Sequence, residues 1–126
     1  MIKKITLLLI SLFLISCTSP YIQKGGIEFK DRNGTYKNND GTIIVIVKDT
    51  DDNNISINIA NLDGLGTVSE TYSVTSAVTT GKFSFDSKIH TSYEYMVNFN
   101  GNTSITFSVR KGTTYPINSQ ELKNTK

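Results

Sequence analysis

The sequence has little of the chemistry that disulfide bonds and zinc sites require. It contains one cysteine, one histidine and no tryptophan. A single cysteine excludes an intramolecular disulfide. One cysteine and one histidine also cannot supply the four ligands of an ordinary structural zinc site. We therefore expect no metal site and no other cofactor.

Neither basic nor acidic residues are in large excess. The chain has 13 basic and 11 acidic residues, and two of the bases, Lys3 and Lys4, stand near the N-terminus. The rest of the chain is therefore close to neutral. Nucleic-acid binding depends on a basic surface that neutralises several phosphates. The charge balance excludes nucleic acid as an expected partner.

A hydrophobic run long enough to cross a membrane is missing as well. The longest apolar stretch covers residues 5–15 and follows Lys3 and Lys4. A membrane-spanning helix needs about 20 apolar residues, whereas the apolar part of a secretion signal has about 7–15. Residues 1–16 therefore predict a signal peptide.

The end of this segment, Leu14-Ile15-Ser16-Cys17, resembles the lipobox of bacterial lipoproteins. The resemblance implies that the Cys17 thiol receives a diacylglyceryl group and that a dedicated peptidase then cuts before Cys17. A third acyl chain joins the new amine in many bacteria. Sulfur suits this chemistry because it is the most nucleophilic side-chain atom near neutral pH. The alternative is an ordinary signal peptide that happens to contain a cysteine, but the usual small-x-small cleavage pattern is missing.

The resemblance predicts the location of the protein. It implies export and attachment to a membrane of the cell envelope through lipid on Cys17. Thr18 stands where some lipoproteins have the Asp that retains them in an inner membrane, so an outer membrane is favoured if the cell has one.

The remaining chain predicts a single domain, because one domain typically takes roughly 100–200 residues. Pro20 and Gly25-Gly26 indicate a flexible segment after the cysteine. We expect a lipidated tether at 17–26, a folded domain at 27–117 and a polar C-terminal tail at 118–126.

Apolar and polar residues alternate through most of the domain, as in Ile55–Ile59, Tyr93–Phe99 and Ile105–Val109. Successive side chains of a strand point to opposite faces, so each set forms one apolar surface. In the last of these strands we expect Phe107 to point inward, and Thr106 and Ser108 outward. The pattern predicts strands near 27–30, 34–38, 42–48, 55–60, 67–75, 82–86, 93–99, 103–110 and 113–117.

These segments define the predicted fold class. They are joined by turns rich in Gly, Asn and Asp, which tolerate the backbone of tight hairpins. We predict an all-β domain, a small antiparallel up-and-down barrel of about eight strands, with a Greek-key β-sandwich as the alternative. Gly34-Thr35-Tyr36-Lys37 followed by Asp40-Gly41-Thr42 is similar to the first hairpin of bacterial lipocalin-like domains, with Tyr36 in place of the usual Trp. The resemblance implies the barrel architecture and no functional residue.

The run Ile43–Val47 departs from alternation, since it is apolar on both faces. One interpretation is a central strand covered on its outside by the N-terminal segment. The other is an exposed apolar stripe that binds a partner or a second copy.

Candidate ligand-binding residues occur on two predicted strands. Glu70 and Tyr72 share one face of the first strand, and Tyr93 and Tyr95 share one face of the second. An inward carboxylate among tyrosines could orient a ligand in an apolar wall. A bulge at Ser69 or a strand that begins at Thr71 would instead place Glu70 in solvent.

The sequence gives no constellation for catalysis. His90 stands alone in a polar segment, and no nucleophile-elbow motif accompanies the serines. We expect a non-catalytic interaction module that binds an unknown protein, or alternatively a carrier of a small apolar ligand. A roomy cavity lined by Tyr72, Tyr93 and Tyr95 would favour the carrier, and a packed interior would favour the module.

Overall fold

The computed structural model describes residues 29–49, 53–74 and 81–125. The predicted signal peptide at 1–16, Cys17 and the tether at 17–26 lie outside the described residues. Among the residues that are described, no helix has the length and apolar character needed to cross a membrane.

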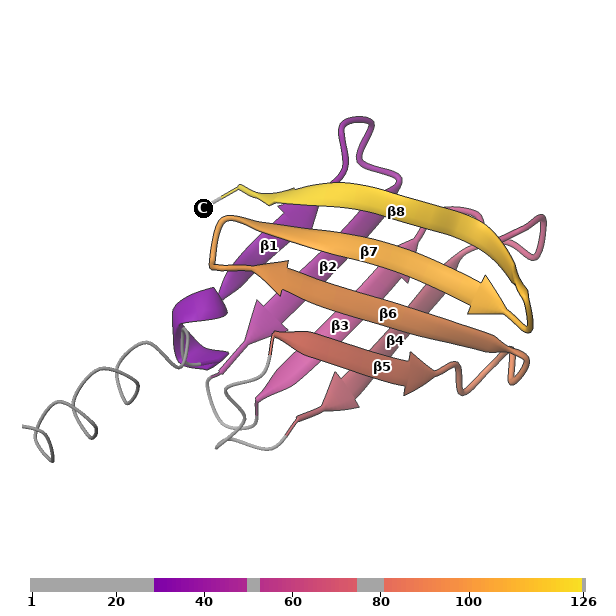
Figure 1. Ribbon diagram of the computed structural model, residues 1–126, viewed down its shortest axis with the longest axis horizontal. Coiled ribbons are helices and arrows are strands. Elements are labelled where there is room, and N and C mark those ends of the chain that lie inside the picture. Colours follow the sequence, from indigo (N-terminus) through magenta and orange to yellow (C-terminus); the bar gives the residue numbers. More distant parts are fainter. Residues whose placement is uncertain (1–28, 50–52, 75–80, 126) are drawn as a thin grey trace, which may run out of the picture.

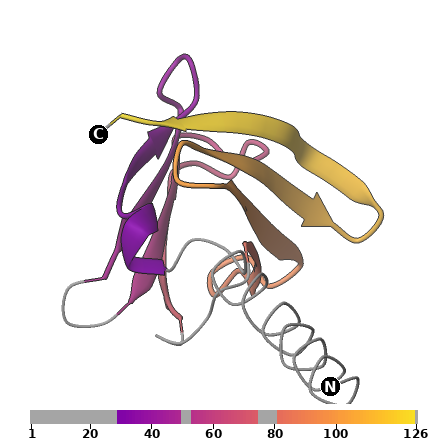
Figure 2. The same cartoon turned by 60° about the vertical axis from the view of Figure 1, so that its left-hand side comes forward.

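The chain forms one antiparallel sheet of eight strands that curls into a nearly closed barrel (Figure 1). The order across the sheet is β4-β3-β2-β1-β8-β7-β6-β5, so each strand pairs with its sequence neighbour except at β1–β8 and at the β4–β5 opening. Figure 2 shows the sheet as two leaves that meet where β8 lies against β1. The predicted all-β up-and-down barrel is confirmed, and the Greek-key alternative is wrong. The strands are β1 (Gly34–Lys37), β2 (Ile43–Lys48), β3 (Asn54–Ile59), β4 (Val68–Ser73), β5 (Lys82–Asp86), β6 (Tyr93–Asn100), β7 (Ser104–Lys111) and β8 (Thr114–Asn124).

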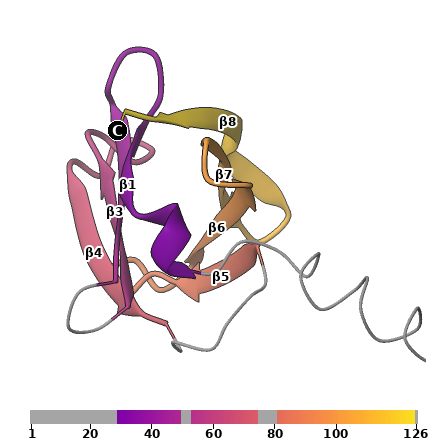
Figure 3. The same cartoon turned by 90° about the vertical axis from the view of Figure 1, so that its left-hand side faces the viewer.

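The first predicted strand, at 27–30, is wrong over its described part. Phe29–Arg32 forms a short 3₁₀-helix, η1, with Phe29 and Arg32 both buried. Side chains three residues apart lie on one side of such a turn, and here they face the end of the barrel. The Tyr36 hydroxyl donates to the Arg32 carbonyl at 2.7 Å. Figure 3 shows η1 across the opening of the ring of strands.

The predicted C-terminal tail at 118–126 is also wrong over most of its length, because β8 continues to Asn124. Leu122 is fully buried and lies opposite Ile105 of β7. The pairing of β7 with β8 contains two irregularities, between Phe107 and Val109 and between Val109 and Lys111. A bulge interrupts the period-2 pattern, so the polar residues around Asn118 hide the strand in the sequence.

Alternate residues of the strands point into the barrel and form its core. In β2, Ile43, Val45 and Val47 are buried, whereas Ile44 and Ile46 on the outer face are half-buried. The outer face of this strand is therefore neither fully covered nor fully exposed among the described residues. The largest fully buried side chains are those of Tyr36, Tyr95, Phe29, Phe107, Ile55 and Ile57.

The prediction that Ser108 points outward does not account for its burial. Phe107 is fully buried as predicted, but Ser108 is buried too, at 8% exposure. Its hydroxyl accepts a hydrogen bond of 3.1 Å from the backbone N–H of Ser119, in the bulged part of β8. The bulge of the neighbouring strand thus covers an outer-face side chain.

Candidate functional site

Glu70 lies inside the barrel, at the opening between β4 and β5. The strand β4 runs without a bulge past this residue, and Glu70 is 5% exposed. The inward orientation that the alternating pattern predicts is therefore confirmed. We use the name Glu70 cluster for Glu70, Tyr72, Ser87, Lys88 and Tyr95.

Four donors surround the Glu70 carboxylate. Oε1 accepts from the Tyr72 hydroxyl at 3.0 Å and from the Lys88 backbone N–H at 2.5 Å. Oε2 accepts from the Ser87 hydroxyl at 2.8 Å and from the Tyr95 hydroxyl at 2.5 Å. An ionised carboxylate has about four lone-pair positions. The protein itself therefore occupies the acceptor capacity that a ligand would need.

These contacts keep Glu70 ionised. Burial raises the pKa of its carboxyl, but the hydrogen bonds from Tyr95, Ser87, Lys88 and Tyr72 outweigh burial, and the pKa lies below its usual value. For Tyr95 and Tyr72, burial and then the hydrogen bond to the carboxylate raise the pKa of the phenol. The tyrosines therefore remain protonated donors, and Glu70 remains their charged acceptor.

The Glu70 cluster also joins the two edge strands. The Tyr72 hydroxyl lies 2.9 Å from the Asp86 carbonyl and shares its proton between that oxygen and Glu70. The Tyr72 ring stacks on Phe85 of β5, with centroids 4.5 Å apart. The Lys88 ammonium donates to the Thr71 carbonyl at 2.7 Å. Side chains thus bridge β4 and β5, which are not paired as strands.

Tyr93 does not belong to this cluster. Its ring is buried, but its hydroxyl donates to the Asp63 carboxylate at 2.8 Å, in the turn between β3 and β4. The Lys111 ammonium lies 5.2 Å from the Tyr93 ring centroid. Of the four predicted ligand-binding residues, the structure brings Glu70, Tyr72 and Tyr95 together and places the polar end of Tyr93 elsewhere.

Aromatic rings fill the interior around the Glu70 cluster. Tyr95 and Phe107 stack with centroids 6.5 Å apart, and Tyr72 meets Tyr95 edge to face at 6.3 Å. Such contacts contribute about 0.5–1.5 kcal/mol each beyond the area they bury. The described interior near Glu70 is therefore packed by aromatic and polar contacts within the protein.

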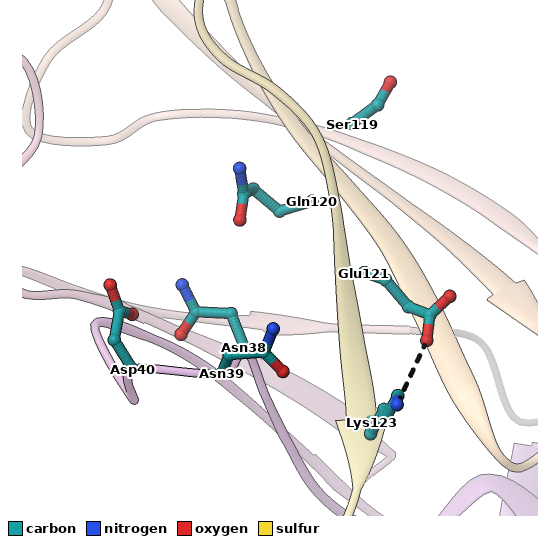
Figure 4. A pocket seen from close by; sticks show the side chains of 7 residues that line it. All are labelled: Asn38, Asn39, Asp40, Ser119, Gln120, Glu121 and Lys123. Carbon is teal, nitrogen blue, oxygen red and sulfur yellow. Dashed lines mark ion pairs between the residues drawn. The ribbon is translucent and has the colours of Figure 1, made fainter.

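A polar hollow lies at the end of β1 opposite η1. Its volume is about 410 Å³, within the usual range for ligand pockets. Figure 4 shows Gln120 reaching from β8 toward Asn38 and Asp40 of the β1–β2 turn. We call this hollow the mouth. It is lined by Asn38, Asn39 and Asp40 of the turn and by Ser119, Gln120, Glu121 and Lys123 of β8.

The mouth exists because β1 is much shorter than β8. The two strands pair only at Tyr36–Asn124 and Lys37–Lys123. Beyond Lys37 the chain turns away into β2, so the earlier part of β8 has no strand neighbour on this side among the described residues. A second hollow of about 300 Å³ continues over Ile43 and Ile59 and shares three lining residues with the mouth, Asn38, Asp40 and Gln120.

Hydrogen bonds hold the turn side of the mouth in place. Asp40 accepts from both the backbone N–H and the hydroxyl of Thr42, at 3.2 and 2.7 Å. Asn38 donates to the Thr42 hydroxyl at 3.0 Å and accepts from the Ile43 N–H at 3.0 Å. The two bonds from Thr42 lower the pKa of Asp40, chiefly the one from the Thr42 hydroxyl, so its carboxylate is a fixed acceptor.

Sequence reasoning did not identify the mouth or the partners of Glu70. Ser87 and Lys88 follow β5 in a polar segment, and no local pattern distinguishes them from other loop residues. Asn39 and Gln120 come together only because β8 continues past the predicted tail. Among the described residues, no group of three or more His, Cys, Asp or Glu side chains is placed to hold a metal ion.

Comparison with protein-family models, curated proteins and solved structures found no match for this chain.

Proposed function

We propose that this protein is a bacterial lipoprotein, held on a membrane of the cell envelope by lipid on Cys17, whose barrel is a non-catalytic binding module. The anchor is supported by the Leu14–Cys17 segment. The binding role is supported by one observation above all: the buried carboxylate is saturated within the protein, while the polar mouth is open.

The proposed anchor needs no membrane-spanning helix. Each buried methylene contributes about 0.8 kcal/mol, and stable anchoring takes about two acyl chains. A diacylglyceryl group on Cys17 supplies two chains. Export follows from the signal at 1–16, and Thr18 favours an outer membrane where the cell has one.

A binding role fits the chemistry of Glu70 better than catalysis does. A general acid or base must reach the proton that it transfers. Glu70 is 5% exposed, and four protein donors hold it in the ionised form. Its position and contacts suit a residue that holds the barrel closed between β4 and β5.

The same contacts favour the binding module over a carrier of a small apolar ligand. A carrier needs space beside Tyr72, Tyr93 and Tyr95. Instead, Glu70 engages the hydroxyls of Tyr72 and Tyr95, and Asp63 engages that of Tyr93. An interior of eight strands is only just wide enough for side chains or one small ligand.

The orientation of the barrel relative to the anchor also supports binding at the mouth. Cys17 precedes η1 in the chain, and β1 then runs from η1 to the turn that lines the mouth (Figure 1). A barrel tethered through the η1 end presents the mouth away from the membrane.

The anchor is tested by replacing the thiol. We expect Cys17→Ser to abolish the incorporation of labelled fatty acid into the protein and to leave the precursor uncleaved before residue 17. Ser16→Ala is the matched control, because it keeps a small residue before the cysteine and should preserve both properties. A Cys17→Ser protein that still incorporates fatty acid would contradict the proposed anchor.

A further inference from the structure

We propose that the mouth binds a neutral saccharide unit, free or as part of a polysaccharide, between the β1–β2 turn and β8. This inference rests on the proposed binding function and names its ligand class.

The first argument is the match between carboxamides and hydroxyl groups. Each Asn or Gln side chain offers donors and an acceptor without net charge, and a sugar hydroxyl is both donor and acceptor. Asn39 and Gln120 line the mouth, and neither side chain makes a hydrogen bond within the part of the chain that the structure describes. Their hydrogen-bonding groups are therefore available to a ligand.

The second argument is charge. Lys123 lies 4.0 Å from Glu121, so these two lining charges face each other. Asp40 is the remaining charged residue of the mouth. A phosphate or carboxylate ligand would find one cation that already has an acidic neighbour, and a cationic ligand would find one carboxylate. A neutral ligand whose hydroxyl donates a hydrogen bond to Asp40 fits this set of charges better than an anion or a cation does.

The third argument is the apolar wall beside the polar rim. Pro116 and Ile117 are partly exposed and form part of the wall of the second hollow, whereas Ile43 and Ile59 beneath it are buried. A pyranose ring has C–H faces and a rim of hydroxyls. Ligand sites combine an apolar surface with a few polar groups that fix orientation, and the two adjoining hollows provide this combination.

An extended peptide is the competing ligand, because the described strands leave the edge of β8 unpaired along the mouth. Two features oppose strand addition there. Pro116 has no N–H to donate to a ladder, and Ser119 has a positive φ of 45° at the bulge. Proline and bulges are devices by which edge strands avoid pairing with another chain. The free edge therefore suits a compact ligand better than a strand.

The test is an amide NMR titration of the full-length protein in a zwitterionic detergent that has no sugar headgroup. The probes are maltose, cellobiose, lactose and N,N′-diacetylchitobiose, with dextran as the polymeric source of the glucose unit. Inorganic phosphate and an extended Val-Thr hexapeptide are the comparison ligands. We expect saturable shifts of the Gln120 and Asn39 side-chain amides with at least one sugar.

Substitutions locate the site. Gln120→Ala should lower the affinity for the sugar that binds by about three- to tenfold, which corresponds to the loss of one neutral hydrogen bond. Ser84→Ala, on the exposed face of β5, is the matched control and should leave the affinity unchanged. Unchanged amide shifts of core residues such as Val45 show that both variants are folded.

Three results would overturn the proposal: no sugar gives saturable shifts, the affinity survives Gln120→Ala unchanged, or the peptide binds in preference with shifts along 114–122. None of them affects the lipid anchor, which the fate of Cys17 tests separately.

Discussion

Glu70 of β4 and Tyr95 of β6 are hydrogen-bonded at 2.5 Å, although β4 is the first strand in the sheet order and β6 is the last but one. Curling of the sheet brings them together across the opening between β4 and β5. The barrel is thus completed at this point by buried side chains in place of a strand ladder. The hydrogen bonds of a strand ladder are made by backbone groups, whereas this closure depends on the side chains of particular residues.

A double-mutant cycle tests whether the Glu70–Tyr95 contact stabilises the fold. We expect Glu70→Gln and Tyr95→Phe to be coupled by about 1–2 kcal/mol in the free energy of unfolding, since hydrogen bonds to charged groups contribute about 1.5–3 kcal/mol. Urea titration of the wild type, both single variants and the double variant measures this coupling. Tyr93→Phe provides the control, because the Tyr93 hydroxyl bonds to Asp63. Its effect should add to that of Glu70→Gln, and equal coupling in both cycles would argue against a specific contact.

Complete removal of the carboxyl should be more severe. Glu70→Ala leaves the Lys88 N–H and the Ser87 hydroxyl without their acceptor, and leaves the Tyr95 hydroxyl with only the Ser87 hydroxyl oxygen, 3.1 Å away. We expect a loss of about 3 kcal/mol, typical for removal of one partner from a buried charged network. Ser73→Ala on the exposed face of the same strand should stay within about 0.5 kcal/mol. Similar urea midpoints for the two variants would show that the Glu70 cluster does not stabilise the barrel.

The depressed pKa of Glu70 predicts a pH dependence with a definite sign. Its folded-state pKa lies below the ordinary value of 4.5, so the stabilisation is complete above that value and is lost as pH falls through the folded pKa. The stability difference between wild type and Glu70→Gln should therefore shrink as pH decreases below 4.5. Urea titrations across this range measure it. A stability difference between wild type and Glu70→Gln that stays constant with pH would mean that the four donors do not stabilise the ionised carboxylate.

The register of β7 gives a prediction about packing. Phe107→Ala removes a fully buried ring and should cost about 3–5 kcal/mol. Thr106→Ala, on the outer face, should fall within about 0.5 kcal/mol. Ser108→Ala should lie between them, near 1 kcal/mol, because its hydroxyl accepts the Ser119 N–H. Equal urea midpoints for the Phe107 and Thr106 variants would contradict the register of this strand.

The local sequence pattern predicts much of this fold, because apolar and polar residues alternate along strands that are buried on one face only. Ile55, Ile57 and Ile59 are all buried on one face as their spacing indicates. The pattern fails where geometry depends on distant partners. Phe29 belongs to a 3₁₀ turn because it packs over the barrel end against Phe83. The strand at Leu122 is concealed by the bulge before it.

The candidate site was predictable only in part for the same reason. Alternation correctly turns Glu70 toward the interior beside Tyr72. The acceptors and donors that complete the cluster come from the loop after β5, and the partner of Tyr93 comes from the turn after β3. No spacing along the chain specifies these contacts, since each requires the closed barrel.

The proposal that this barrel works as a lipid-anchored module is tested most directly by the intact mass of the protein purified from membranes of cells that express it. We predict a chain that begins at Cys17 and carries the added mass of a diacylglyceryl group, with a further acyl chain where the cell adds one. A chain that begins at another residue, or one that retains an unmodified Cys17 thiol, would contradict the proposal.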